Sequence, residues 1–235
     1  MSRRSSDSGH PLQLFDSHLH IIDPRFPLVG DYRPEPFTVE DYRRRIAGIE
    51  VVGGAVVSGS FQGFDQTYLL DALQRLGPAF VGVTQLPSTV ADEEVLALDA
   101  AGVRAVRFTL ARGGALDIDL ALRVHELAGW HAEVYATDLP AHEAALRELP
   151  RLVVDHLGMN PEGLAAAVRL GAMVKATPRV TLDARAVPPG HLLFGTDLPG
   201  TRTERVFAPE HLDVIAGITN SALVENARAW YRPRA

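Results

Sequence analysis

The feature that most constrains the fold is a repeated alternation between short apolar runs and longer amphipathic stretches. Eight runs have the length and composition of buried strands, at residues 14–21, 54–60, 79–86, 103–110, 131–137, 151–158, 172–178 and 191–197. Between them lie helical patterns such as "DEEVLALDAAG", which ends in a helix-terminating glycine. Strict alternation favours parallel strands joined by right-handed crossovers. Eight such units predict a closed (β/α)₈ barrel of the TIM type, and an open doubly wound sheet is the alternative.

The seventh unit departs from this pattern. Between the last two apolar runs lies only "RVTLDARAVPPG", which is too short and too proline-rich for a full helix. We therefore expect a loop with at most one helical turn there. The chain contains neither a linker nor an internal repeat, so residues 13–235 are expected to form a single barrel domain. Residues 1–12 are expected to form a flexible N-terminal tail.

Composition narrows the classes of partner and chemistry. The formal net charge of −6 argues against nucleic acid as a partner, and the absence of cysteine excludes disulfides, thiolate ligands and cysteine nucleophiles. No apolar run reaches about 18 residues, and the N-terminal segment lacks the apolar core of a signal peptide. We therefore expect a cytoplasmic protein without membrane association. We expect a small-molecule substrate as the ligand. The sequence leaves open whether the protein forms a homo-oligomer.

Polar side chains gather where the predicted strands end. His18 and His20 lie two positions apart on the first run, so alternation places both imidazoles on one face. His156 lies near the end of the sixth run, and Asp197 ends the eighth. In a barrel the C-terminal strand ends meet at one mouth, where catalytic residues gather. We therefore predict that these four side chains form an active site.

Three imidazoles and one carboxylate suit a divalent zinc or manganese ion. A metal-bound water, or a water held by Asp197, would then attack an ester or amide carbonyl. Without a metal, the same imidazoles could polarise that carbonyl by hydrogen bonding. Alternation also predicts that Asp16 shares the face of the two N-terminal histidines and that Asp155 faces away from His156.

The fourth run places an arginine inside the barrel. Val106 and Phe108 form an apolar face suited to the helices, so Arg107 should point inward. A buried guanidinium needs an anion, which is either a substrate carboxylate or Glu133, because the fifth run directs Glu133 and Tyr135 inward. Both interpretations stay open.

The motifs "FDSHLH", "DHLG" and "LLFGTDLP", in this order, resemble those of the amidohydrolase superfamily. More narrowly, they are similar to the amidohydrolase-2 branch that contains the 2-pyrone-4,6-dicarboxylate lactonases and sugar lactonases. The resemblance implies a hydrolase of cyclic esters. His18, His20 and His156 would polarise the lactone carbonyl or, with Asp197, bind one divalent metal, and Asp197 would be the general base.

The resemblance also implies a set of substrate-binding residues, namely Arg107, Tyr135, Ser58, Ser60, Tyr32 and Arg179. The superfamily's bridging carboxylated lysine on the fourth strand has no counterpart, which argues against a binuclear centre. Two alternatives remain. One is a zinc-dependent non-oxidative decarboxylase of the same fold, and the other is a degenerate, non-catalytic barrel, which the shortened seventh unit suggests.

Overall fold

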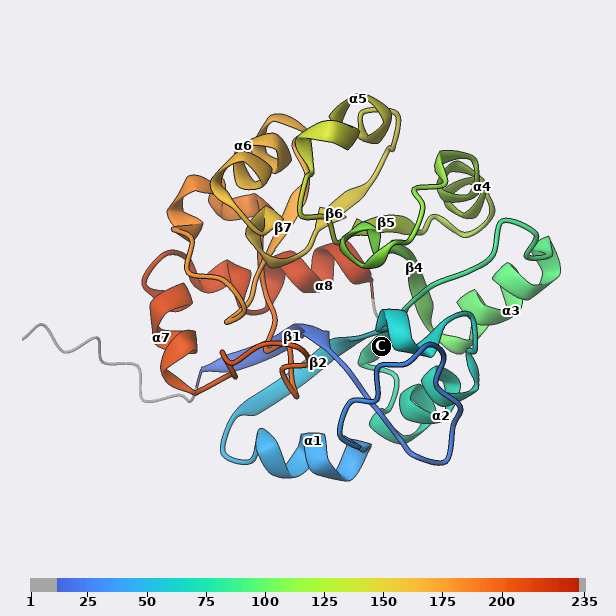
Figure 1. Ribbon diagram of the computed structural model, residues 1–235. Helices are drawn as coiled ribbons and strands as arrows, with labels where there is room; N and C mark the ends of the chain where they lie inside the picture. Colours follow the sequence, from blue (N-terminus) through green and yellow to red (C-terminus); the bar gives the residue numbers. More distant parts are fainter. Residues whose placement is uncertain (1–11, 233–235) are drawn as a thin grey trace, which may run out of the picture.

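The computed structural model describes residues 12–232 and shows a ring of eight parallel strands (Figure 1). The strands pair in chain order and are β1 (Gln13–Leu19), β2 (Glu50–Val57), β3 (Phe80–Thr84), β4 (Val103–Phe108), β5 (His131–Val134), β6 (Leu152–Val154), β7 (Met173–Ala176) and β8 (Leu192–Phe194). Beyond the last strand, the Asp197 amide donates to the His18 carbonyl (2.7 Å) and the His20 amide to the Leu198 carbonyl (2.8 Å). These bonds close the ring, so the predicted (β/α)₈ barrel is confirmed. Apart from Leu12, the predicted tail lies outside the described residues.

Within residues 12–232, helices α1 to α7 surround the strands in chain order (Figure 1). They are α1 (Val39–Arg45), α2 (Thr67–Leu76), α3 (Asp92–Ala101), α4 (Ile118–Ala128), α5 (Glu143–Leu146), α6 (Pro161–Arg169) and α7 (Glu210–Ala216). Local sequence fixes their ends. The Asn160 side chain caps α6 by accepting from the Gly163 amide, and Gly102 ends α3 in the left-handed conformation. Within the described residues, no helix combines the length and apolar character of a membrane span.

The connection from β7 to β8 contains only two single-turn 3₁₀ segments, Ala184–Ala186 and Pro189–His191. The prediction of a shortened seventh unit is therefore confirmed. A cavity of about 430 Å³ with a largely apolar lining lies between this connection and α7. None of the residues predicted to form the active site lines it.

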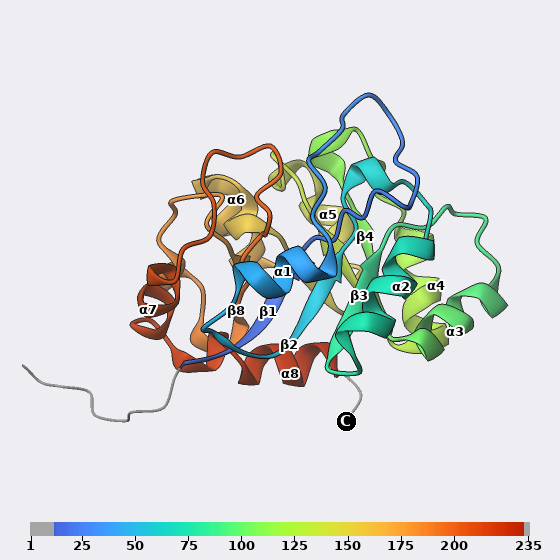
Figure 2. The same cartoon turned by 90° about the horizontal axis from the view of Figure 1, so that it is seen from below.

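The side chains inside the barrel form two layers. Phe15, Val57, Val83, Met173, Leu193 and their neighbours fill the interior together with Ala227 and Tyr231 of α8 (Glu225–Tyr231). Helix α8 lies across the end of the barrel opposite the long loops (Figure 2). The rest of the interior is polar, because β4, β5 and β7 contribute the buried charged residues Arg107, Glu133 and Lys175.

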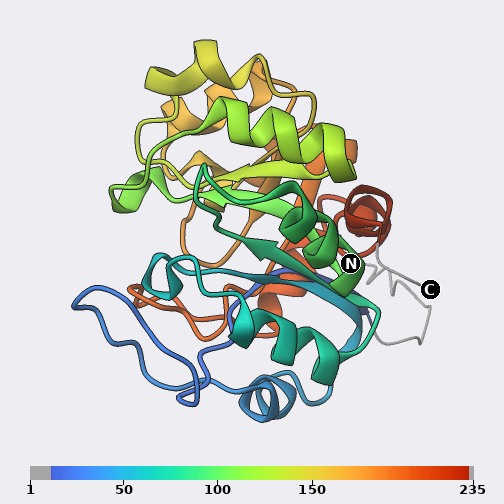
Figure 3. The same cartoon turned by 90° about the vertical axis from the view of Figure 1, so that its right-hand side faces the viewer.

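The long loops lie over the C-terminal strand ends. The segment between β1 and α1 runs beside the loop that follows β2 (Figure 3), where the Val29 amide donates to the Phe61 carbonyl (2.8 Å). These loops overhang the side of the barrel on which the predicted histidines lie.

Candidate active site

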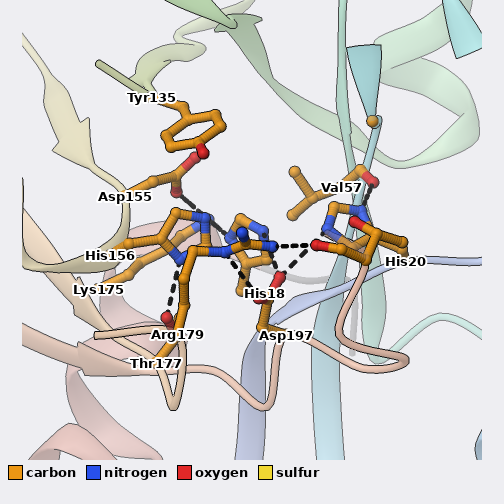
Figure 4. A network of polar contacts seen from close by, with 12 residues as sticks. His18, His20, Val57, Tyr135, Asp155, His156, Lys175, Thr177, Arg179 and Asp197 are labelled. Atoms are coloured by element: carbon orange, nitrogen blue, oxygen red, sulfur yellow. Dashed lines mark hydrogen bonds and ion pairs between the residues drawn. The ribbon is translucent and has the colours of Figure 1, made fainter. Parts of the chain in front are cut away.

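The four side chains expected to form the active site lie together at the C-terminal end of the barrel (Figure 4). His20 Nε2 is 3.3 Å and His18 Nε2 is 3.7 Å from Asp197 Oδ1. The ring centroids of His18 and His156 are 4.8 Å apart. All four residues are at most 3% exposed, so the cluster is shielded from bulk water.

An irregularity in β1 turns the two N-terminal histidines inward. Asp16 pairs with Gly54 and Leu19 with Val56, so β1 spans three steps where β2 spans two. This bulge resets the alternation of side chains. The prediction that Asp16 shares the face of the histidines is wrong, because Asp16 accepts hydrogen bonds from Tyr42 Oη (3.1 Å) in α1 and from the amide of Thr196 (2.8 Å).

The end of β6 corrects a second expectation. Leu152 and Val154 pack in the apolar layer between the strands and the helices, whereas Val153 packs inside the barrel. Continued alternation therefore brings Asp155 into the barrel. The prediction that Asp155 faces away from the site is therefore wrong. His156 also points inward because the strand has ended and its backbone adopts the left-handed conformation (φ 52°).

Asp197 reaches the cluster through a similar turn. Its φ of 54° lies in the left-handed region, which aspartate tolerates better than most residues. Two positions earlier, a Cβ on Gly195 would lie 2.4 Å from the Cβ of His18. Only glycine therefore allows the first and last strands to approach closely enough to bring Asp197 to His18.

Burial and neighbouring charges set the protonation of the cluster. Burial lowers the pKa of His18 to about 4, and burial also lowers that of His156 well below its usual value. Burial alone would raise the pKa of Asp197, but the neighbouring imidazoles and Arg179, whose Nε lies 3.0 Å from Asp197 Oδ2, hold it below its usual range. At neutral pH the cluster thus combines a carboxylate with neutral His18 and His156.

The lowered pKa of His18 predicts a loss of stability in acid. The unfolded chain takes up a proton at His18 below about pH 6.5, whereas the folded protein takes it up only near pH 4. The free energy of unfolding should therefore fall between these pH values, by roughly 3 kcal/mol from His18 alone. Urea unfolding at several pH values should show a shallower fall in His18→Gln than in the parent protein. Parallel pH curves for the two proteins would contradict the assignment.

Beneath the cluster, two buried ion pairs carry four charges. Arg107 donates to Asp155 Oδ2 through Nε (3.1 Å) and Nη2 (2.7 Å), and Lys175 donates to Glu133 Oε2 (2.5 Å). The alternative that Arg107 pairs with Glu133 is therefore wrong, since each of them has a different partner. Arg107 also donates to the Ser58 carbonyl (2.6 Å). Nε, Nη1 and Nη2 of the Arg107 guanidinium therefore all donate to groups within the protein.

A small pocket of about 30 Å³ adjoins the cluster. Most of the predicted substrate-binding residues line it. Two further arginines, Arg112 and Arg202, also line it. The lining includes His20, His156, Ser60, Arg107, Tyr135, Arg179, Arg112 and Arg202. Neither Arg112 nor Arg202 forms an ion pair with a carboxylate in residues 12–232, so both leave positive charge available to a ligand. Arg112 instead donates to Tyr135 Oη (3.1 Å).

Two of the predicted residues stand apart from this lining. The Ser58 hydroxyl is fully buried against Tyr68 Oη of α2, and Ser58 contributes its carbonyl rather than its side chain to the charged network. Tyr32 lies at the rim, where the guanidinium of Arg202 stacks on its ring at 3.7 Å. The sequence analysis gave no role in the site to Asp155, Lys175 or Arg202. The signal for Lys175 is a lysine within an apolar strand, which requires a buried anionic partner.

The cluster offers ligand atoms that suit a metal ion. His18 Nε2 and Asp197 Oδ1 are buried without a hydrogen-bond partner among the described residues. His20 Nδ1 lies 2.7 Å from the Val57 carbonyl, which can only accept, so a neutral His20 turns its Nε2 lone pair toward Asp197 Oδ1. Two acceptors in contact require a proton or a cation. The three side chains therefore fit one divalent cation.

Comparisons with known proteins agree with this geometry. The family model described as amidohydrolase matches residues 15–232. A 4-sulfomuconolactone hydrolase from Rhizobium radiobacter is 30% identical over 131 residues, covering 53% of this chain and 43% of that protein. A 2-pyrone-4,6-dicarboxylate hydrolase from Comamonas testosteroni is 28% identical over 168 residues, covering 63% of this chain and 52% of that protein. The alignments thus span about half the length of these curated relatives.

The fold also has solved relatives. A crystal structure of an Agrobacterium tumefaciens protein in its apo form superimposes with a TM-score of 0.80 at 21% identity, covering 95% of this chain and 97% of that one. At this level of identity the similarity establishes the shared barrel architecture, and the chemistry has to be argued from the site itself.

Proposed function

Because the chain belongs to the amidohydrolase family, we propose that it is a hydrolase that opens a lactone ring in a small anionic substrate. One observation carries the proposal. A buried carboxylate, Asp197, lies within 3.7 Å of two imidazoles, and one of these, His20, lines a pocket rich in arginine. Such a site can hold a water, remove its proton and stabilise the negative charge that develops on an attacked carbonyl.

Asp197 is the proposed general base. Arg179 donates to its Oδ2, whereas Oδ1 has no hydrogen-bond partner among the described residues and is free to accept a proton. Water would attack the lactone carbon while Asp197 takes its proton, forming a tetrahedral intermediate. When the acyl C–O bond of the ring breaks, the same carboxyl would return the proton to the departing ring oxygen, so that the product is an acid with a free hydroxyl, or an enol where the ring oxygen is bonded to an unsaturated carbon.

The imidazoles are proposed to polarise the lactone carbonyl. His18 and His156 lie beside the carboxylate in a site that excludes bulk water, where hydrogen bonds to a developing oxyanion are strongest, whereas His20 presents a lone pair on Nε2. Tyr135 packs edge-on against the ring of His156 at 5.1 Å and limits its movement. When held by His18, His20 and Asp197, a zinc or manganese ion supplies Lewis-acid polarisation of the same carbonyl.

The charge of the pocket supports an anionic substrate. Arg112 and Arg202 have no carboxylate partner within the described residues, and a guanidinium binds carboxylates and sulfonates through paired hydrogen bonds. The two curated relatives are named for lactones with acidic substituents, which agrees with this charge. We therefore propose carboxylated or sulfonated lactones as the substrate class.

A panel of lactones tests the proposal. We expect hydrolysis of 2-pyrone-4,6-dicarboxylate or 4-sulfomuconolactone, with kcat/KM at least about 100-fold above that for an uncharged δ-lactone. Proton release at constant pH measures turnover, and elemental analysis of untagged protein measures metal content. Inactivity toward every lactone in the panel, with and without added zinc or manganese, would reject the proposal.

The second candidate function is non-oxidative decarboxylation of an aromatic acid, which the three metal-competent ligands favour. This reaction releases carbon dioxide and requires the metal, whereas lactone opening consumes water without gas release. Measuring carbon dioxide from hydroxybenzoates incubated with the zinc-loaded protein separates the two functions.

A further inference from the structure

The chain contains a single lysine, and it is buried inside the barrel directly below the cluster. Lys175 lies on β7 and is 0% exposed. Its Nζ donates to Glu133 Oε2 (2.5 Å) and lies 3.4 Å from His18 Nδ1 and 3.5 Å from Asp155 Oδ1. The proposed mechanism gives this lysine no role, although it contacts a histidine of the site (Figure 4).

His18 Nδ1 has two neighbours of opposite hydrogen-bonding character. The Lys175 ammonium can only donate, and Asp155 Oδ1, at 3.3 Å, can only accept. A neutral imidazole carries one proton, on either nitrogen. The neighbour that binds Nδ1 therefore decides whether Nε2 presents a hydrogen or a lone pair to the pocket.

The geometry favours the lysine. The contact between Lys175 Nζ and His18 Nδ1 meets the criteria of a hydrogen bond, whereas Asp155 Oδ1 has no hydrogen-bond partner among the described residues. A proton on Nδ1 would also point toward an ammonium group, which has no lone pair to accept it. Arg107 meanwhile holds the other oxygen of Asp155, at 2.7 and 3.1 Å, and draws that carboxylate toward itself.

The ammonium group is itself held in place from below. Glu133 Oε1 accepts from Tyr231 Oη (2.7 Å) in α8 and lies 3.1 Å from His131 Nε2. Its other oxygen binds Lys175. A chain of contacts thus runs from the helix that covers the bottom of the barrel to the histidine at its mouth.

We propose that Lys175 is a positioning residue that keeps His18 in the Nε2–H tautomer, so that His18 directs a hydrogen-bond donor toward the space beside Asp197 Oδ1. The use of this donor on a lactone carbonyl rests on the proposed function, whereas the tautomer is a property of the free protein. In this form His18 has no Nε2 lone pair, so it ligates a cation only after that proton leaves. The tautomer thus favours hydrogen-bond polarisation in the metal-free protein.

Nitrogen-15 NMR of metal-free protein with labelled histidine and lysine tests the proposal. Two-bond correlations between the carbon-bound ring protons and the ring nitrogens identify which nitrogen is protonated. The signals that disappear in His18→Gln are those of His18. The single lysine gives a single Nζ signal. We expect an ammonium and a His18 ring protonated on Nε2. A neutral Lys175 amine, a His18 ring protonated on Nδ1, or a doubly protonated His18 ring would overturn the proposal. Each of these outcomes can be seen in the parent protein without any variant.

A double variant tests whether Lys175 is what keeps the His18 proton on Nε2. Lys175→Met with Glu133→Gln removes the ammonium without leaving a buried unpaired carboxylate. Asp155 Oδ1 then remains beside Nδ1, and the His18 proton should move to Nδ1. Tyr231→Phe is the matched control, because it removes a different hydrogen bond to Glu133 and should leave the tautomer unchanged. A proton that stays on Nε2 in the double variant would overturn the role of Lys175.

Kinetics provide a separate readout if the lactone panel yields a substrate. Loss of an oxyanion donor should lower kcat of the double variant by about 10²-fold or more while KM changes little. An unchanged kcat would overturn the use of the donor in catalysis. A failed lactone panel would reject the proposed function and leave the NMR result standing, so the two failures are distinguishable.

Discussion

Replacing Asp197 with asparagine is expected to lower kcat by about 10² to 10⁴-fold, the usual contribution of a positioned general base. The carboxamide has the volume of the carboxylate and its oxygen can still accept from Arg179 Nε, so the barrel should keep its fold. It cannot, however, take a proton from water. Initial rates on the best lactone of the panel, with circular dichroism of the same samples, measure both effects.

The matched control is Asp183→Asn, which makes the same chemical change at an exposed aspartate that caps the 3₁₀ segment after β7. Its kcat should equal that of the parent protein. A fully active Asp197→Asn variant would remove the general base from the mechanism and with it the main support for hydrolysis.

Replacing Arg107 with methionine is expected to lower the free energy of unfolding by about 3 to 5 kcal/mol. The change leaves Asp155, which is 0% exposed, without the guanidinium that binds its Oδ2 through two hydrogen bonds. Methionine retains much of the volume of the arginine stem, so lost packing should contribute less than the unpaired charge. Urea unfolding followed by circular dichroism measures the change.

Two further variants isolate the buried charge. Arg107→Met combined with Asp155→Leu should recover at least half of the loss, because no charge of that pair is then left buried. Arg147→Met removes an exposed partner of Glu143 one helical turn away and should cost at most about 0.5 kcal/mol. A loss in Arg107→Met as small as that in Arg147→Met would show that the buried pair is not needed to compensate charge.

The fold could be predicted from the sequence because its signals are local. Each strand is a short apolar run, and helix ends carry their own markers, such as Asn160 before α6 and Gly102 after α3. Even the missing helix between β7 and β8 is visible in the prolines of that segment. A regular series of parallel units then leaves few arrangements other than a barrel.

The side chains of the site were harder to predict because strict alternation fails at strand ends. The bulge in β1 moves Asp16 away from the histidines, and the early end of β6 places Asp155 and His156 both inside the barrel. Neither irregularity has a clear signal in the residues themselves, since both depend on pairing with neighbouring strands. The partners of Arg107 and Lys175 were hidden for the same reason.

The close contact of Gly195 with His18 has a consequence for how the enzyme is assembled. Asp197 and its nearest imidazoles come from the segment after β8 and from β1, and they meet along the seam where the first and last strands close the ring. A fragment that lacks either of these two strands lacks part of this constellation, so we expect it to be inactive even where the remaining strands pair.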